Sequence, residues 1–260
     1  MVRKQRYASP LALNEIGRPP IARSYKPPKF GWITVFSFSG KNRASQIVTR
    51  KVFWDEPYQT ALDTIVSQVD GEQVQVEATI FFAFSGGQES DCGSLAGYPV
   101  IKAEKLGLEI VYTLPHDHSL SVGDCVTWRI DWERRYRLMR LHFAAEMVLQ
   151  LVYRLRPGIE RIGAHIAQDK ARIDFASDVS LAPLFPEIES AAADLTARDL
   201  AILTDFSDVQ TQRRYWKVDG FAMMACGGTH PKSTHEIGAV KLKRKNTGRG
   251  KERIEVILVG

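Results

Sequence analysis

The feature that most constrains the fold of this chain is a change of pattern at residue 134. Residues 134–155 contain no glycine or proline, and their apolar side chains recur at helical spacing, which predicts one long helix. Pro157 and Gly158 predict its end. Residues 52–127 instead consist of short strand-like runs separated by turns rich in Gly and Asp, a pattern typical of a small β-barrel.

The individual elements follow from the spacing of apolar residues. Val74, Val76, Ala78 and Ile80 alternate with polar residues, which predicts a strand with one buried face. The remaining predicted elements are strands over residues 108–112 and 126–130, a strand with its turn over 168–175, a second helix over 188–203, and a hairpin with strands at 239–243 and 253–258.

The composition is that of a soluble globular protein: of 260 residues, 44% are hydrophobic and 25% are charged. No run approaches the roughly 18–20 apolar residues that a membrane-spanning helix needs, and the first residues lack the apolar segment of a secretion signal. The three cysteines are widely spaced and odd in number, which argues against a disulfide framework. We therefore expect a cytoplasmic protein.

The positive net charge is concentrated in a Pro-containing leader, residues 1–48, which holds nine Lys or Arg and one acid. The leader carries +8, so of the total of +5 the rest of the chain carries −3. Net charge therefore gives no reason to expect that residues 49–260 bind nucleic acid.

Two pairs of side chains carry groups suited to chemistry. His142 and Glu146 are four residues apart in the predicted long helix, so the imidazole and the carboxylate project from one face and can converge on a metal ion. Cys226 and His230 enclose two glycines and a threonine, which places a thiol and an imidazole on one tight turn. The four groups together form a ligand set suited to tetrahedral zinc. Four protein ligands would close such a site, so catalysis would require one of them to be weak or displaceable.

Each pair also has an ordinary explanation. A His and a Glu four residues apart are common on helices, and the Cys-Gly-Gly-Thr-His segment can be a structural turn with a buried thiol. Because both pairs occur in one chain, the metal site is the favoured interpretation.

The order of these motifs resembles a known family. Residues 226–230, followed by residues 236–238 (Glu-Ile-Gly), a Lys-rich strand and residues 253–255 (Arg-Ile-Glu), resemble the C-terminal signature of the alanyl-tRNA synthetase editing domain. This domain also occurs as free-standing alanyl-tRNA editing proteins called AlaX. A segment similar to the family's metal-binding helix contains Arg134, Arg135, Met139, Arg140 and His142. A second segment, residues 79–88 with Asp91 and Gly93, resembles the Gly-rich segment of the family's small barrel.

The resemblance implies both a fold and a function. The fold is α+β, with a small Gly-rich β-barrel (residues 49–132) followed by a two-layer α+β editing domain (residues 133–260) that has Zn²⁺ in its cleft. The function is editing in trans: hydrolysis of mischarged tRNA for alanine, with serine and also glycine as the amino acids removed. A pocket sized for alanine discriminates poorly against these two, which is why a second, hydrolytic site is useful.

The resemblance also implies roles for residues near the Gly-rich segment. By the family pattern Thr79 reads the seryl hydroxyl and Gln88 takes part in catalysis, while Gly86 and Gly87 bind the aminoacyl end through backbone N–H groups. The residues alone leave ordinary alternatives open, because Thr79 also fits a plain strand and the two glycines a tight turn.

The chain departs from the family pattern at one metal-ligand position. The family's helix usually carries a second His where this chain has Glu146. Two roles for Glu146 remain open: a zinc ligand, since carboxylates bind zinc, and a general base. Phe143 and His235 are further departures, and they bear on the substrate range rather than on the fold.

Several alternatives remain open at the level of function. The basic hairpin, with Arg244, Lys245 and Arg249, either contacts tRNA phosphates or is an edge strand protected by lysines. The leader is an unstructured tail, a tRNA-binding arm, or a segment before a true start at Val48 that is not translated. The competing functions are a deacylase of a different aminoacyl ester and a catalytically silent tRNA-binding module. The oligomeric state is not predicted.

Overall fold

Strands are the commonest regular element of the described chain, residues 48–259 of the computed structural model, and two α-helices accompany them. The leader before Val48, with its candidate strand at residues 32–36, lies outside the described residues.

The first part of the described chain forms a curled antiparallel sheet in the order β6-β5-β9-β2-β3-β8-β7. The first half of the long strand β2 pairs with β9 and its second half pairs with β3, so the sheet bends around an apolar cluster. Pairing between the outer strands β6 and β7 is not seen in residues 48–259, and a closed barrel stays a prediction. The strands are β2 (Ala61–Asp70), β3 (Gln73–Val76), β5 (Gly93–Leu95), β6 (Tyr98–Pro99), β7 (Lys102–Leu106), β8 (Glu109–Thr113) and β9 (Cys125–Ile130).

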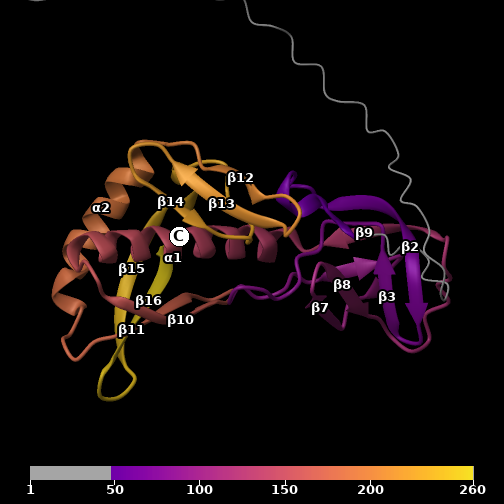
Figure 1. Ribbon diagram of the computed structural model, residues 1–260, viewed down its shortest axis with the longest axis horizontal. Coiled ribbons are helices and arrows are strands. Elements are labelled where there is room, and N and C mark those ends of the chain that lie inside the picture. Colours follow the sequence, from indigo (N-terminus) through magenta and orange to yellow (C-terminus); the bar gives the residue numbers. More distant parts are fainter. Residues whose placement is uncertain (1–47, 260) are drawn as a thin grey trace, which may run out of the picture. The chain divides into compact units, whose positions relative to one another are not determined.

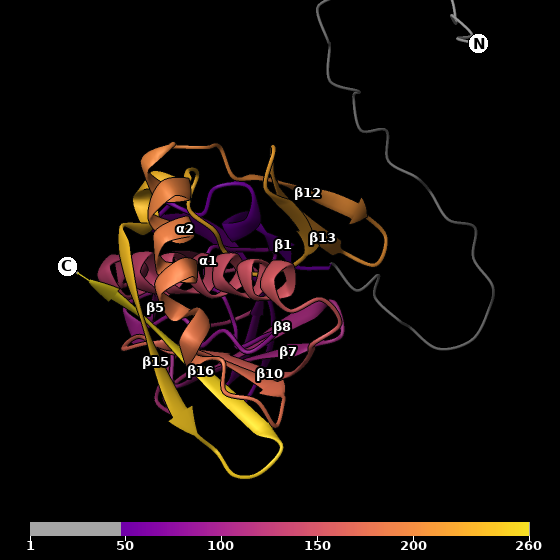
Figure 2. The same cartoon turned by 90° about the vertical axis from the view of Figure 1, so that its left-hand side faces the viewer.

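The second part places the long helix α1 (Trp132–Leu155) against a four-stranded antiparallel sheet (Figures 1 and 2). The sheet has the order β10-β11-β16-β15, and the shorter helix α2 (Phe185–Ala197) packs against α1 and β15. Its strands are β10 (Glu160–Ile166), β11 (Ala171–Ala176), β15 (Ala239–Asn246) and β16 (Lys251–Val259).

Smaller elements complete the described chain. A three-stranded antiparallel sheet has β13 in its centre, and a short parallel pair joins β1 to β4. These elements are β12 (Leu203–Asp208), β13 (Arg213–Val218), β14 (Ala222–Ala225), β1 (Arg50–Lys51), β4 (Ala78–Thr79), and 3₁₀ helices at Val52–Trp54, Ala182–Leu184 and Thr234–Ile237.

The long helix begins and ends where the sequence indicates. Asp131 caps α1 by accepting a hydrogen bond from the backbone N–H of Arg134 at 3.1 Å, and the helix runs to Leu155, as predicted. Its middle section, from Leu138 to Val152, is almost entirely buried. Because this section contacts three strands of the sheet and α2, α1 forms the centre of the second apolar cluster.

Most of the predicted strands are present, and two predictions need correction. The predicted strand through Val74 and Ile80 is divided at Glu77 into β3 and β4, and Ile80 lies beyond the end of β4. The N–H of Glu77 still donates to the carbonyl of Ile65 on β2. The predicted helix over 188–203 ends early, since α2 stops at Ala197 and residue 203 begins β12. Asp199 adopts φ +49°, a left-handed conformation that ends a helix.

Neither α1 nor α2, the two α-helices within residues 48–259, is both long and apolar enough to cross a membrane.

Candidate metal centre

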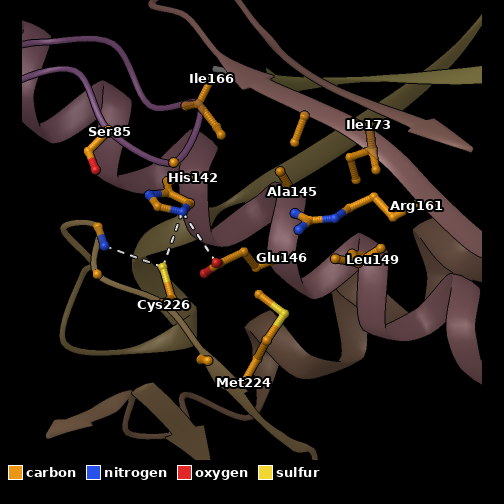
Figure 3. Close-up of a pocket in the computed structure, with 15 residues that line it drawn as sticks. Ser85, His142, Ala145, Glu146, Leu149, Arg161, Ile166, Ile173, Met224 and Cys226 are labelled. Carbon is orange, nitrogen blue, oxygen red and sulfur yellow. Dashed lines mark hydrogen bonds and ion pairs between the residues drawn. The ribbon is translucent and has the colours of Figure 1, made fainter. Parts of the chain in front are cut away.

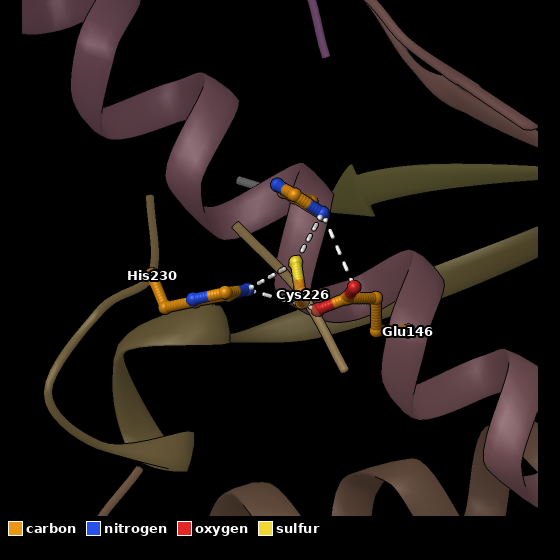
Figure 4. Close-up of side chains that lie close together, drawn as sticks. Glu146, Cys226 and His230 are labelled. Carbon is orange, nitrogen blue, oxygen red and sulfur yellow. Dashed lines mark hydrogen bonds and ion pairs between the residues drawn. The ribbon is translucent and has the colours of Figure 1, made fainter. Parts of the chain in front are cut away.

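Four side chains from two distant segments meet at one point. His142 and Glu146 project from one face of α1, while Cys226 and His230 belong to the loop that follows β14. One ligand atom from each lies within 4.8 Å of the ligand atoms of all the others. Figure 4 shows Glu146, Cys226 and His230 converging beside the helix. The structure therefore brings together the four residues that the sequence pairs suggested.

The carboxylate of Glu146 lies between the two imidazoles. Its Oε1 is 3.3 Å from Nε2 of His142 and its Oε2 is 2.9 Å from Nε2 of His230. The Sγ atom of Cys226 is 3.5 Å from Nε2 of His142 and 3.4 Å from Nε2 of His230. Both imidazoles thus present the same nitrogen, Nε2, to the centre of the cluster.

Gln88 sets the orientation of the His142 ring. Its side-chain oxygen lies 2.6 Å from Nδ1 of His142, and its side-chain nitrogen donates to the hydroxyl of Thr229 at 2.9 Å. An amide oxygen can only accept, so Nδ1 of His142 donates to it and Nε2 is the ring nitrogen that faces the cluster. A partner on the outer nitrogen is usual for metal-binding histidines.

The loop that carries Cys226 and His230 requires glycine at one position. A Cβ atom on residue 228 would overlap the ring of His142 and the side-chain oxygen of Gln88. The backbone of the loop can therefore approach α1 only because Gly228 has no side chain.

Burial influences the protonation of the cluster. Burial raises the pKa of the Cys226 thiol well above its ordinary value, and the neighbouring Glu146 carboxylate adds to this rise. Burial opposes ionisation of Glu146 as well, but the charges and hydrogen bonds of His142 and His230 outweigh it and hold the pKa of Glu146 well below its usual range. Burial lowers the pKa of His230. A bound cation would favour the thiolate of Cys226, because metal binding releases the thiol proton.

A cavity of about 300 Å³ opens beside the cluster (Figure 3). The cluster lies at one end, and apolar side chains of α1, β10 and β11 line the rest. Its other lining residues are Ser85, Gly86, Ala145, Leu149, Arg161, Ala164, Ile166, Ile173, Met224, Ala225, Gly227 and Gly228. A volume of about 300 Å³ is at the lower end of the range for small-molecule sites.

The donor set fits a metal ion. Two neutral imidazole nitrogens, a carboxylate oxygen and a sulfur are the ligands that borderline divalent metals prefer. All four side chains are held in place by a helix or by a tight loop, and His142, Glu146 and His230 are each at most 7% exposed. The residues present can therefore hold a metal ion.

The structure also locates the residues that the sequence assigned to the substrate. Gly86 lines the cavity, and Gly87 packs directly on the backbone of Ala164. Thr79 is fully buried away from the cavity, and its hydroxyl accepts hydrogen bonds from Tyr112 and from the N–H of Phe81. The structure therefore does not bring Thr79 to the cavity, because its hydroxyl is hydrogen-bonded to Phe81 and Tyr112, two members of the apolar cluster of the curled sheet.

Sequence reasoning missed most of the residues that line the cavity. Ser85 supplies the only hydroxyl and Arg161 the only Lys or Arg side chain among the lining residues of the described chain, while Leu149 and Met224 form part of its apolar wall. Ser85 directly precedes the two glycines, a position that could have indicated it. Arg161 lies in a strand that the sequence pattern did not predict.

The predicted nucleic-acid-binding residues lie on the β15–β16 hairpin and its turn. Lys245 and Arg249 are exposed. Arg244 lies on the opposite face of the strand from Lys245, where its guanidinium donates to both carboxylate oxygens of the buried Glu252. Of the three, Arg244 is thus already engaged by an acid.

Comparisons with known proteins agree with these features. Residues 215–255 match the family described as the threonyl and alanyl tRNA synthetase second additional domain. The alanyl-tRNA editing protein AlaX-M of Methanosarcina barkeri is 31% identical over 243 residues, covering 82% of this chain and 100% of the relative. The AlaX-M protein of Pyrococcus horikoshii is 28% identical over 215 residues, covering 81% of this chain and 98% of the relative. The alanine–tRNA ligase of Ignicoccus hospitalis is 30% identical over 75% of this chain but only 24% of the ligase.

Proposed function

This chain belongs to the family of alanyl-tRNA editing proteins and is an editing deacylase, and we propose that it removes serine, and also glycine, from mischarged tRNA for alanine with the help of zinc. The observation that carries the proposal is the meeting of His142, Glu146, Cys226 and His230 at one end of a cavity of about 300 Å³. The cluster supplies the metal ligands, and the cavity supplies room for the aminoacyl end of a tRNA.

The distances within the cluster support zinc. For tetrahedral zinc, bonds of about 2.0–2.1 Å to nitrogen and about 2.3 Å to sulfur place neighbouring ligand atoms roughly 3.3–3.6 Å apart. Three of the four contacts, at 3.3, 3.4 and 3.5 Å, fall in this range, and the fourth, at 2.9 Å, is a hydrogen bond between His230 and Glu146. These four residues would hold the zinc ion, which would supply Lewis-acid chemistry for ester hydrolysis.

The remaining chemistry comes from the protein itself. Gln88 keeps the outer nitrogen of His142 protonated and so keeps the ring in the orientation that the cluster requires. The carboxylate of Glu146 lies at the cavity wall, where it joins the cluster to the space proposed for the aminoacyl ester. The side chains of Leu149 and Ile166 form part of an apolar wall beside the cluster.

The two open roles of Glu146 are not equally supported. Both of its carboxylate oxygens are engaged by imidazoles, and both imidazoles belong to the proposed ligand set. This arrangement supports a ligand role for Glu146, in the position where the family usually has a histidine, over the role of a general base. Thr79, buried outside the cavity, stays a prediction as the reader of the seryl hydroxyl.

We propose the two-part organisation as well, with a small barrel over residues 49–132 and an editing domain over 133–260. Two separate apolar clusters support it: the fully buried members of the first lie between Val52 and Ile130, and those of the second between Leu138 and Leu258. The bounds themselves remain a prediction. Transfer RNA is the proposed partner, and cytoplasmic location remains a prediction.

The test of the proposed function is hydrolysis of seryl-, glycyl- and alanyl-charged tRNA for alanine by the zinc-loaded protein. We expect loss of the seryl and glycyl esters with the alanyl ester spared. Cys226→Ala should reduce kcat/KM by at least about 100-fold, because ligand loss should cost at least as much as loss of an outer-shell partner. No turnover of any of the three esters by folded, zinc-loaded protein would overturn the substrate assignment.

Zinc content provides a second readout that does not depend on activity. The wild type should bind one zinc per chain, and Cys226→Ala should bind well under one. Cys125→Ala is the matched control, since Cys125 is an exposed free thiol outside the cluster. Equal zinc content in the two variants would contradict the ligand assignment.

A further inference from the structure

Arg161 reaches the cavity only because β10 is irregular. The pairing of β10 with β11 shifts between Arg161, opposite Phe175, and Gly163, opposite Asp174, so that Ile162 is the extra residue of a β-bulge. A regular ladder would place Ile162 opposite Phe175 and turn Arg161 to the other face of the sheet. The bulge instead puts Arg161 on the same side as Ala164 and Ile166, which line the cavity.

Arg161 is exposed, and its guanidinium has no acceptor among the residues that the structure describes. Among residues 48–259, no carboxylate oxygen lies within 4.0 Å of it and no hydrogen bond engages it, in contrast to the paired Arg134 and Arg135. Figure 3 shows the side chain extended from β10 over the cavity, with the guanidinium directed toward the side where Ala145 and Glu146 lie. A guanidinium offers five N–H donors and binds carboxylate or phosphate through two of them at once.

The lining of the cavity therefore offers groups of different kinds. Glu146 and Cys226 belong to the metal cluster, and Arg161 supplies the only Lys or Arg side chain among the lining residues of the described chain. The apolar side chains of Leu149, Ile166 and Ile173 also line the cavity. A ligand that fits this lining carries an anionic group for Arg161 and a reacting group that lies beside the cluster.

The end of a charged tRNA has this arrangement, if the proposed function is correct. A seryl or glycyl ester carries one cation, the α-ammonium group, and no anion. The ester is attached to the terminal adenosine, whose nearest anion is the phosphate on its 5′ side. We propose that Arg161 binds this phosphate and thereby sets the direction in which the aminoacyl end enters the cavity, with the ester at the metal cluster.

The first experiment compares two small esters, seryl-adenosine and the same ester of adenosine 5′-monophosphate. The wild type should hydrolyse the phosphate-bearing ester with a kcat/KM about 10- to 100-fold higher, as expected for hydrogen bonds between charged groups. In Arg161→Ala this preference should disappear, so that the two esters are hydrolysed with similar kcat/KM. Arg161→Lys should restore part of it, since a point charge replaces the two-pronged contact.

Arg172→Ala is the matched control. Arg172 lies on the neighbouring strand β11, opposite His165, and does not line the cavity. The Arg172→Ala variant should keep the preference for the phosphate-bearing ester. Retention of the preference in Arg161→Ala, or equal loss in both variants, would overturn the proposal. Selective loss of turnover on an ester with an acidic side chain, with the phosphate preference unchanged, would also overturn it and assign Arg161 to a side-chain carboxylate.

A binding measurement separates this proposal from the proposed function. Titration calorimetry should show that the wild type binds adenosine 5′-monophosphate about 10-fold or more tightly than adenosine, and that Arg161→Ala binds both equally. If no ester is hydrolysed but this difference is found, the deacylase assignment fails and the phosphate site stands. If esters are hydrolysed but the difference survives in Arg161→Ala, the phosphate site fails alone.

Discussion

At the scale of single residues, Arg135 connects the long helix to the curled sheet. Its guanidinium pairs with the carboxylate of Asp91 and donates to the backbone carbonyls of Pro57 and Ile80. Both charged side chains are fully buried. Asp91 also accepts from the N–H of Phe82, so the pair holds the segment that leads to the Gly-rich turn against α1.

Replacing Arg135 by methionine should therefore be strongly destabilising. The change keeps much of the side-chain volume but leaves the Asp91 carboxylate buried without its cation, which typically costs about 3–5 kcal/mol. Urea unfolding of the two proteins measures the difference. Adding Asp91→Leu to Arg135→Met should recover much of the loss, because it removes the unpaired charge. A loss below about 1 kcal/mol in the single variant would show that the pair contributes little.

At the scale of elements, α1 carries two different faces. His142 and Glu146 face the cavity, while Leu138, Leu141 and Val148 are buried in the second apolar cluster. The four-residue spacing of the ligands is a local property of a helix. The burial of His142 and Glu146, in contrast, depends on the strands and the second helix that pack around α1.

The β15–β16 hairpin also has two faces, which predicts different effects for its basic residues. Removing exposed Lys245 and Arg249 together should weaken tRNA binding and lower the slope of log affinity against log salt by about 2, since each phosphate contact contributes roughly 0.7–0.9. Arg244→Ala should instead lower the melting temperature, because the buried Glu252 loses its partner.

Filter binding or fluorescence anisotropy at several salt concentrations checks the first effect, and thermal unfolding checks the second. Lys217→Ala is the control, an exposed lysine on β13 outside the hairpin. An unchanged salt slope in the double variant would mean that the hairpin is a solvated edge rather than a contact surface.

At the scale of the whole molecule, the proposed zinc site joins segments that are far apart in the chain. Cys226 lies 84 residues beyond His142, and the loop that carries it also touches the first part of the chain, where the indole N–H of Trp54 donates to the carbonyl of Gly227 at 2.8 Å. A metal ion that binds all four ligands binds only the folded chain, and so shifts the unfolding equilibrium.

Zinc should therefore raise the melting temperature. At a free zinc concentration of 100 times Kd, binding raises the free energy of unfolding by about 2.7 kcal/mol. For a chain of this size each kcal/mol raises the melting temperature by roughly 2–4 °C, so the expected shift is roughly 5–10 °C. Differential scanning calorimetry with and without a chelator measures it. Cys226→Ala should show little shift, and magnesium, which prefers oxygen ligands, should have no effect on the wild type. Equal shifts with zinc and magnesium would contradict the ligand assignment.

What the sequence determined about this protein was local. The period of the apolar residues predicted α1 almost to the residue, and the same helical spacing put His142 and Glu146 on one face. The strands at residues 108–112 and 126–130 and the C-terminal hairpin also follow from local alternation, and they are present as β8, β9 and β15–β16. The candidate ligands could be proposed because each pair lies within one short segment.

The tertiary structure decided how these local pieces meet. A side chain's surroundings depend on pairing register, on bulges and on turns far away in the chain, and no short window of sequence contains that information. Packing therefore buried Thr79 beside Tyr112, outside the cavity. A one-residue bulge turned Arg161 into the cavity, and the absent side chain of Gly228 let the Cys226 loop reach α1. The sequence determined which groups are available, and long-range packing determined which of them share a site.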